Sequence, residues 1–491
     1  MNSDNIQQKV FTGLFWKFSE RICAQFISFI VSIILARLLL PEEYGVVSLI
    51  MVFITIANVF VTSGLSSSLI QKKDANEIDF STVFYCTIIM SILIYIFLFI
   101  ISKYIAIFYG MPELKLYLRI FSIKILISAY NSMQHAYISR NMMFKKFFFS
   151  TIIGTIISGI IGILMAYKGF GAWAIIAQYL SNSLIDTIVL NFTIPWHPKL
   201  IFSRKAAKSL VGFGWKVLVT DLLGTLFDNL RSLLIGRFYT SADLAFYNKG
   251  QQFPQLIGNN IDTSLTSVLF PAMSNSSDNI EKVKAMTRRS MKISSYIIFP
   301  MMAGLIAISK NLVILLLTEK WLDSVIFLKI LSISQAMSTI SKANIQAMKA
   351  IGRSDITLKL EFIKKPIYLI ILIYSIKYGV LAIAVSMMVY SFIGTFINMV
   401  PNKRLLNYSS KEQLLDLIPS TLLSILMCIV VFLIGLLNYN RVVLISIQVL
   451  AGILVYIILS KVFKVDSYEY LKNILKNINI SKGKKNVKEN N

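Results

Sequence analysis

The chain has 491 residues, of which 56% are hydrophobic and 15% are charged. Because a membrane-spanning helix needs about 20 mainly apolar residues, this composition supplies roughly 12 to 14 spans and leaves little chain for aqueous domains. It therefore excludes a soluble enzyme. The 49 lysines and arginines, against 24 acidic residues, leave a net charge of +25. That excess suits nucleic acid, anionic lipid or an anionic cargo as a partner.

Hydropathy along the chain predicts fourteen membrane-spanning helices. In chain order they cover residues 15–39, 44–68, 80–102, 116–137, 147–167, 172–193, 212–235, 245–270, 290–309, 325–349, 357–377, 380–400, 417–437 and 442–463. The longest connections, 195–211 and 273–289, are too short for an extramembrane domain. The first apolar run, 15–40, is too long for the hydrophobic part of a cleavable signal peptide.

Basic residues between the spans predict the orientation. With the N-terminus in the cytoplasm, connections on that side carry about 20 lysines and arginines and those on the opposite side about nine, as the positive-inside rule requires. The even number of spans returns the C-terminus to the cytoplasm. The lysine-rich tail, 464–491, is interpreted as a contact with anionic lipid headgroups rather than nucleic acid, since no binding motif accompanies the lysines.

Cysteine and histidine are too scarce for a disulfide framework or a metal centre. The cysteines lie far apart inside apolar runs, at Cys23, Cys86 and Cys428. The histidines are His135 and His197. Because no cluster has metal-ligand spacing, we expect no metal, no cofactor and no catalytic residue.

The sequence contains an internal repeat at a shift of about 200 residues. Residues 13–17 (GLFWK) match 212–216 (GFGWK), and 36–38 (ARL) correspond to 236–238 (GRF). Six predicted helices separate the copies, so both copies have the same orientation, as in parallel transporter repeats. We therefore predict an all-α integral membrane protein with two pseudo-symmetric six-helix lobes around a central cavity, plus two C-terminal helices.

The repeat also predicts the domain limits. Residues 1–195 form the N-terminal lobe, 196–211 a cytoplasmic amphipathic linker, and 212–400 the C-terminal lobe. Residues 401–463 hold spans 13 and 14, and 464–491 are the basic cytoplasmic tail. A cleft between the lobes is the expected cargo site.

Polar residues inside the predicted spans are the candidates for that site. Each charge at the bilayer centre costs roughly 2.5 to 3.5 kcal/mol on insertion scales and must be offset by water or a partner. In several spans these residues recur every three or four positions, which places them on one helix face. The candidates for binding substrate are Arg21, Gln25, Lys124, Arg231, Lys249, Gln255 and Asn259. The carboxylates that are candidates for coupling to an ion are Glu20, Asp221, Asp228 and Asp262.

Two interpretations of the deepest charges stay open. They either line a water-filled cavity or form structural ion pairs between helices. The residues concerned are Arg21, Lys124, Asp228, Arg231 and Asp262. His135 is interpreted as an interior histidine with satisfied hydrogen bonds.

Four segments carry a resemblance to a known family. They are 36–45 (ARLLLPEEYG), 234–238 (LIGRF), 243–249 (DLAFYNK) and 270–274 (FPAMS). The chain resembles polysaccharide flippases of the multidrug/oligosaccharidyl-lipid/polysaccharide exporter superfamily over essentially its whole length. It is most similar to the Wzx-type branch, which serves colanic acid, O-antigen and related exopolysaccharides. Ala245 departs from the family pattern, which more often has glycine there.

The resemblance implies a transporter of the bacterial inner membrane with both termini in the cytoplasm. Its cargo would be an undecaprenyl-diphosphate-linked oligosaccharide, moved to the periplasmic leaflet by alternating access of two lobes for exopolysaccharide, O-antigen or lipopolysaccharide biosynthesis. Implied partners are this lipid-linked oligosaccharide, membrane lipids and polysaccharide polymerase machinery, with no nucleic acid. Coupling to H⁺ or Na⁺ is a hypothesis.

Two rival functions are weighed against this one. A cation-coupled drug antiporter of the same superfamily would need an acidic and aromatic cavity rather than a basic one. An integral-membrane glycan polymerase would need a sizeable periplasmic loop with catalytic residues, and every outside connection is short.

Overall fold

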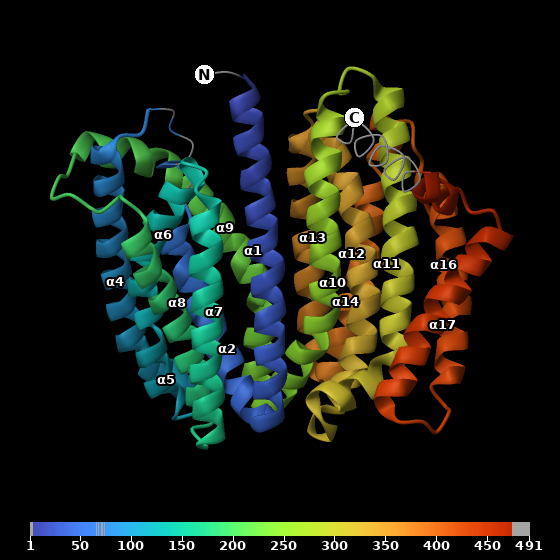
Figure 1. The fold of residues 1–491 in the computed structure, drawn as a ribbon, viewed down its shortest axis with the longest axis horizontal. Coiled ribbons are helices and arrows are strands. Elements are labelled where there is room, and N and C mark those ends of the chain that lie inside the picture. Colours follow the sequence, from blue (N-terminus) through green and yellow to red (C-terminus); the bar gives the residue numbers. More distant parts are fainter. Residues whose placement is uncertain (1–2, 65, 67, 70–71, 73, 474–491) are drawn as a thin grey trace, which may run out of the picture. The chain divides into compact units, whose positions relative to one another are not determined.

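The computed structural model describes residues 3–473 except 65, 67, 70, 71 and 73. Every regular element in this part of the chain is a helix (Figure 1). The α-helices are α1 (Ser3–Leu38), α2 (Pro41–Thr62), α4 (Glu77–Tyr109), α5 (Leu114–Phe121), α6 (Ile123–Arg140), α7 (Phe144–Tyr167), α8 (Ala172–Thr193), α9 (Arg204–Phe238), α10 (Ser241–Ser274), α11 (Ile280–Leu317), α12 (Ser324–Ala350), α13 (Ser354–Ser375), α14 (Val380–Met399), α15 (Asn402–Leu405), α16 (Ser410–Ile434) and α17 (Arg441–Val462). Two short 3₁₀ helices are η1 (Glu319–Trp321) and η2 (Ile376–Tyr378).

Helices cover most of each of the fourteen predicted spans among the described residues, and one span is divided between two α-helices. Residues 116–137 belong to α5 and α6, which are separated at Ser122. Ten helices among the described residues are long and apolar enough to cross a membrane, and α9 adds an eleventh if its two parts count as one span. Helices α6, α10 and α13 are more polar. The all-helical membrane fold is therefore established, whereas the count of fourteen crossings stays a prediction.

The helix α9 begins earlier than the sequence suggested. Its first turns, from Arg204, occupy half of the predicted linker 196–211, and a bend of 44° separates Arg204–Gly212 from Gly214–Phe238. The connection before it is fixed to α4, because the backbone amides of Lys199 and Ser203 donate to hydroxyls of that helix at 3.1 Å.

The repeat is visible in the helix ends. Helix α1 ends at Leu38 and α2 begins at Pro41, while α9 ends at Phe238 and α10 begins at Ser241, so both boundaries recur 200 residues later. An acidic residue caps each second helix. Glu43 accepts from the amide of Leu40 at 2.8 Å, and Asp243 accepts from the amide of Thr240 at 3.1 Å. Carboxylates in the first turn satisfy free amides and suit the helix dipole.

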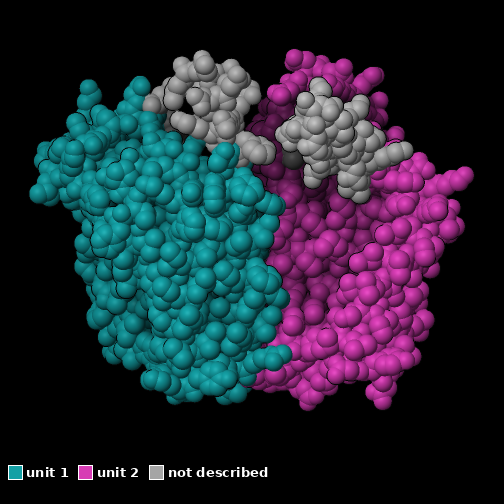
Figure 2. Space-filling model, viewed as in Figure 1, with its two compact units in different colours: residues 1–245 teal, residues 246–491 magenta. Residues whose placement is uncertain are grey.

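The helices group into two compact units, Met1–Ala245 and Phe246–Asn491 (Figure 2). Unit 1 holds α1 to α9 and the first residues of α10, and unit 2 holds the rest. Helix α9 packs on α2 and α4, and the hydroxyl of Tyr109 donates to the carbonyl of Leu233 at 3.4 Å. Each unit is a group of helices that pack on one another. The domain limits given by the sequence remain predictions. Residues 474–491 of the predicted tail lie outside the described residues.

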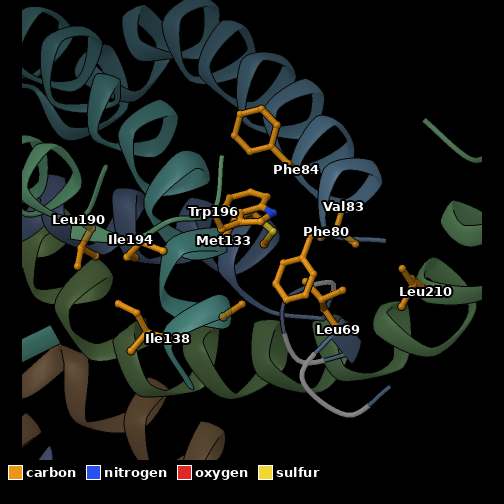
Figure 3. Packing of buried hydrophobic residues seen from close by; sticks show 11 residues of the cluster. Leu69, Phe80, Val83, Phe84, Met133, Ile138, Leu190, Ile194, Trp196 and Leu210 are labelled. Carbon is orange, nitrogen blue, oxygen red and sulfur yellow. The ribbon is translucent and has the colours of Figure 1, made fainter. Parts of the chain in front are cut away.

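An aromatic cluster packs around Trp196 (Figure 3), at the end of unit 1 where a connection joins α8 to α9 (Figure 1). Trp196, in the connection between α8 and α9, lies 5.7 Å from the ring of Phe80 and 6.3 Å from those of Phe84 and Tyr137. Arg140 donates from its guanidinium to two backbone carbonyls of the segment before α4. The connections at this end are therefore anchored to the helices.

The last two long helices, α16 and α17, pack on α11 in unit 2. Arg288 of α11 makes two hydrogen bonds of 2.7 and 2.9 Å to the carboxylate of Asp416 on α16. Tyr296 of α11 donates to the hydroxyl of Ser460 at 2.8 Å and accepts, through its carbonyl, from Tyr456 at 2.9 Å. These contacts join the predicted spans 13 and 14 to the rest of unit 2.

Candidate functional site

A buried polar network in unit 1 is centred on Asp186 of α8. Its carboxylate accepts from the amide of Asn131 at 2.8 Å, lies 3.1 Å from a ring nitrogen of His135, and accepts from the hydroxyl of Ser150. The donors come from α6 and α7. The Asp186 side chain is only 14% exposed, so three polar groups hold this charge inside the helices.

Glu20 of α1 belongs to the same network. Helix α1 packs along α7, where Thr151 hydrogen-bonds the Glu20 carboxylate. Both His135 and Asp186 lie close enough to interact electrostatically with Glu20. His135 therefore interacts with two carboxylates, one on α1 and one on α8.

Asp186 was missed as a candidate by the sequence analysis, and His135 was interpreted as structural. A signal was present, since Gln178, Asn182 and Asp186 recur every four residues in an otherwise apolar span. Such spacing puts them on one helix face. The amide of Asn182 indeed donates to Ser158 of α7 at 3.3 Å, so this face of α8 is the polar one.

The other candidates of unit 1 have different surroundings. On α1, Arg21 is exposed and Gln25 is partly buried. The ammonium of Lys124 on α6 lies 5.1 Å from the ring centroid of Tyr179, a cation–π distance. Arg231 on α9 is buried, with 9% of its surface exposed.

Two further acidic candidates lie on α9. Asp221 and Asp228 are exposed, seven residues apart on one side of the helix. Both are therefore more exposed than Glu20, which is partly buried. Their coupling role stays a prediction.

In unit 2, the candidates lie along α10. Lys249 is 6% exposed, and its ammonium donates to Gln252 at 3.2 Å and lies 5.7 Å from the ring centroid of Trp321. Gln255 and Asn259 follow on the same helix and are exposed. The Lys249 side chain is thus buried, whereas the two amides are accessible.

Asp262, one turn after Asn259, forms an ion pair with Lys342 of α12. The carboxylate side chain is 7% exposed and the lysine side chain 41% exposed. Of the two interpretations left open by the sequence, an interhelical ion pair is therefore present at Asp262.

The candidates are divided between the units. Arg21, Gln25, Lys124 and Arg231 belong to unit 1, and Lys249, Gln255 and Asn259 to unit 2. Among the coupling candidates, Glu20 joins the Asp186 network and Asp262 pairs with lysine. No group of three or more histidine, cysteine or acidic side chains within the described ranges has a geometry that could hold a metal ion.

Comparison with known sequences identifies relatives of this chain. The family described as "Polysaccharide biosynthesis protein" matches residues 34–326, which is more than half of the chain. The teichuronic acid biosynthesis protein TuaB of Bacillus subtilis is 26% identical over 72% of this chain and 73% of its own length. The lipopolysaccharide biosynthesis protein WzxC of Escherichia coli is 21% identical, covering 84% of this chain and 85% of its own.

Solved structures share the fold. The lipid II flippase MurJ, in an inward closed conformation, superposes with a TM-score of 0.75 at 19% identity, covering 93% of this chain and 99% of its own. An inward-facing multidrug resistance transporter of the MATE family gives a TM-score of 0.60 at 14% identity, covering 78% of this chain and 94% of its own. The helices of this chain therefore follow the MurJ and MATE fold.

Proposed function

This chain belongs to the polysaccharide biosynthesis protein family, and from that premise we propose that it is an inner-membrane flippase for undecaprenyl-diphosphate-linked oligosaccharides. The family match is the observation that carries the proposal. The printed names of TuaB and WzxC place both in glycan biosynthesis, and the MurJ fold is one that moves a lipid-linked cargo. A diphosphate with its sugars cannot cross about 30 Å of hydrocarbon unaided.

The cargo chemistry is assigned to the polar candidates of both units. Arg21, Lys124, Arg231 and Lys249 would bind the diphosphate through charge-assisted hydrogen bonds. Gln25, Gln255 and Asn259 would bind sugar hydroxyls, because amides both donate and accept. Arg231 and Lys249 lie within helices α9 and α10, and the proposal gives them a diphosphate because its negative charge attracts basic side chains.

The proposed direction is from the cytoplasmic to the periplasmic leaflet, by alternating access of two lobes. Both termini would lie in the cytoplasm, where the basic connections and the tail contact anionic headgroups. Polysaccharide polymerase machinery is a proposed downstream partner, because a translocated repeat unit must then be joined to a growing chain.

Coupling to H⁺ or Na⁺ is part of the proposal. In unit 1, protonation of Glu20 or Asp186 would change how each interacts with His135, which gives the network two charge states. Asp221, Asp228 and Asp262 are the remaining candidates. Transport that continues undiminished after all ion gradients are collapsed would refute the coupling.

A reconstitution experiment tests the cargo. Purified protein in liposomes with undecaprenyl-diphosphate-linked oligosaccharide should expose the glycan to an added glycosidase. The double variant Arg21→Gln/Arg231→Gln should slow this exposure at least about tenfold, because each lost charge-assisted bond is worth roughly 1.5–3 kcal/mol. The control is Arg353→Gln, which removes an exposed arginine paired with Asp355.

The same experiment separates the rivals. Glycan exposure no faster than in protein-free liposomes would favour the drug antiporter of the same superfamily, whereas unchanged exposure in the folded double variant would reject the two arginines as diphosphate ligands. A glycan polymerase would instead lengthen the oligosaccharide without moving it, which chain-length analysis of the recovered glycan detects.

A further inference from the structure

Three helices of unit 2 enclose a narrow polar cavity around Asp262. We call this cavity the Asp262 chamber. Polar side chains make up most of its wall, and they are Asp262 and Thr266 on α10, Ser290 and Ser294 on α11, and Thr339, Lys342 and Gln346 on α12. Two leucines of α10 and an alanine of α12 complete the wall.

Four oxygen atoms in this chamber are buried and unsatisfied. Asp262, Ser290, Ser294 and Thr339 are each at most 6% exposed. Lys342 engages one carboxylate oxygen of Asp262, while the other oxygen and the three hydroxyls hydrogen-bond no described group of the protein. Buried polar atoms are rarely left unsatisfied, so their convergence on one cavity indicates a site for an occupant that these oxygens bind.

Size and chemistry limit the occupant. The cavity accommodates a body about the size of one water molecule. Its unsatisfied atoms are all oxygens, the ligands that hard cations prefer. One carboxylate balances one positive charge, which favours a small monovalent cation such as Na⁺ over a divalent ion.

Lys342 is more exposed than the four residues that carry the unsatisfied oxygens. Its side chain is 41% exposed, while that of its partner Asp262 is 7% exposed. An anion at the accessible side can therefore draw the ammonium away from the carboxylate. The carboxylate would then remain buried without a countercharge, which is strongly unfavourable unless another cation takes the place of the ammonium.

We propose that the Asp262 chamber binds one Na⁺ in exchange for the Lys342 ammonium, and that the released lysine holds a diphosphate. The diphosphate step rests on the proposed function and specifies its coupling to an ion at Asp262, whereas Na⁺ binding to the chamber can be measured without any cargo. By linkage, each of the two ligands raises the affinity for the other. The exchange would thereby link cargo binding to an ion without direct contact between them.

The cation site is tested by thermal unfolding of the purified full chain in nanodiscs. NaCl is titrated against N-methylglucamine chloride at constant ionic strength, and the concentration of half-maximal stabilisation is measured. Lys342→Met should bind Na⁺ about tenfold or more tightly than the wild type, because its internal competitor is gone. Asp262→Asn should abolish the stabilisation, and Ser294→Ala should weaken it.

A matched control uses the same helix. Lys349→Met removes an exposed lysine of α12 outside the chamber and should leave the Na⁺ titration unchanged. Equal stabilisation of Lys342→Met by Na⁺ and N-methylglucamine would overturn the site and assign the chamber to water alone.

The exchange is tested separately with inorganic pyrophosphate. It should raise the apparent Na⁺ affinity of the wild type several-fold and leave that of Lys342→Met unchanged. No effect on the wild type would overturn the exchange. Glycan flipping is measured independently in liposomes, so its persistence in Na⁺-free buffer would overturn the proposed exchange and leave the flippase proposal standing.

Discussion

At the scale of single residues, buried carboxylates connect neighbouring helices within each of the two units. Asp186 gathers donors from α6 and α7, and Asp416 gathers the guanidinium of Arg288 and the hydroxyl of Tyr408 at 2.7 Å. A buried carboxylate that lost these donors would be left uncompensated. Each of these acids therefore ties helices together as well as carrying charge.

The variant Asp186→Asn tests the network in unit 1. It removes the charge that strengthens three contacts, so we expect a loss of about 2 kcal/mol in the free energy of unfolding. Thermal unfolding in detergent measures it. Asp278→Asn, an exposed aspartate before α11, is the control and should unfold like the wild type. Equal stability of the two variants would contradict a structural role for Asp186.

A pH dependence follows from Tyr408, which lies in the connection before α16. Burial raises the pKa of its hydroxyl above the ordinary value, and the hydrogen bond to Asp416 raises it further. The folded state thus retains a proton that the unfolded chain loses near pH 10, so stability falls as pH rises above about 10. Tyr408→Phe is less stable at neutral pH, and its deficit in Tm should narrow above pH 10. A constant deficit up to pH 11 would count against this pKa.

At the scale of elements, the junction between α1 and α2 and the junction between α9 and α10 are two copies of one helix corner. Both have the same kind of N-terminal cap, but they differ in packing. Position 43 is glutamate and position 243 is aspartate, both capping from the third helical residue. A Cβ on Gly45 would lie 1.7 Å from the carbonyl oxygen of Ser241. Only glycine permits this approach, whereas the corresponding Ala245 is accommodated as a buried side chain.

This difference in packing predicts that exchanging glycine and alanine is strongly destabilising at position 45 and only mildly destabilising at position 245. Gly45→Ala should cost more than about 3 kcal/mol, because the contacted atom belongs to the backbone and cannot move aside. Ala245→Gly should cost about 1 kcal/mol at most, the usual price of glycine in a helix. Folded yield by size-exclusion chromatography distinguishes them. A normal folded yield of Gly45→Ala would contradict this prediction and show that the backbones at Gly45 and Ser241 can move apart.

Helix positions could be predicted from the sequence because apolar runs of sufficient length have few alternatives in a bilayer. The ends were less accurate. Helix α4 continues to Tyr109 and α11 begins at Ile280, since helices extend through polar turns that hydropathy does not count. The spacing of polar residues along single helices identified Glu20 and Asp262 as candidates. It did not identify Asp186 and Lys342 as their neighbours, because contacts between helices depend on how the helices pack, which the spacing within one helix does not show.

At the scale of the whole molecule, the basic residues divide into those that predict the orientation of the chain and those that are proposed to bind the cargo. Most basic residues fall in the connections predicted from the sequence or in the tail, where the positive-inside rule uses them to predict the orientation. A smaller set, including Arg231 and Lys249, is buried inside helices. Under the proposed topology, most of the +25 charge determines orientation, and only these buried positions are proposed to bind the cargo.

Orientation is tested by cysteine labelling. The native cysteines are replaced by serine, and single cysteines are introduced as Lys199→Cys or Lys320→Cys. A membrane-impermeant maleimide should label position 320 in intact cells and position 199 only after permeabilisation, because these connections are assigned to opposite sides. The reverse pattern would invert the proposed topology.

The aromatic cluster at one end of unit 1 provides an intrinsic optical reporter. Trp196 is 7% exposed and its ring lies among Phe80, Phe84 and Tyr137. Its indole belongs to the segment that joins α8 to α9, so any rearrangement of that segment changes the polarity around the fluorophore. With the other tryptophans replaced by phenylalanine, the emission wavelength of Trp196 would follow the junction in real time, without an attached dye.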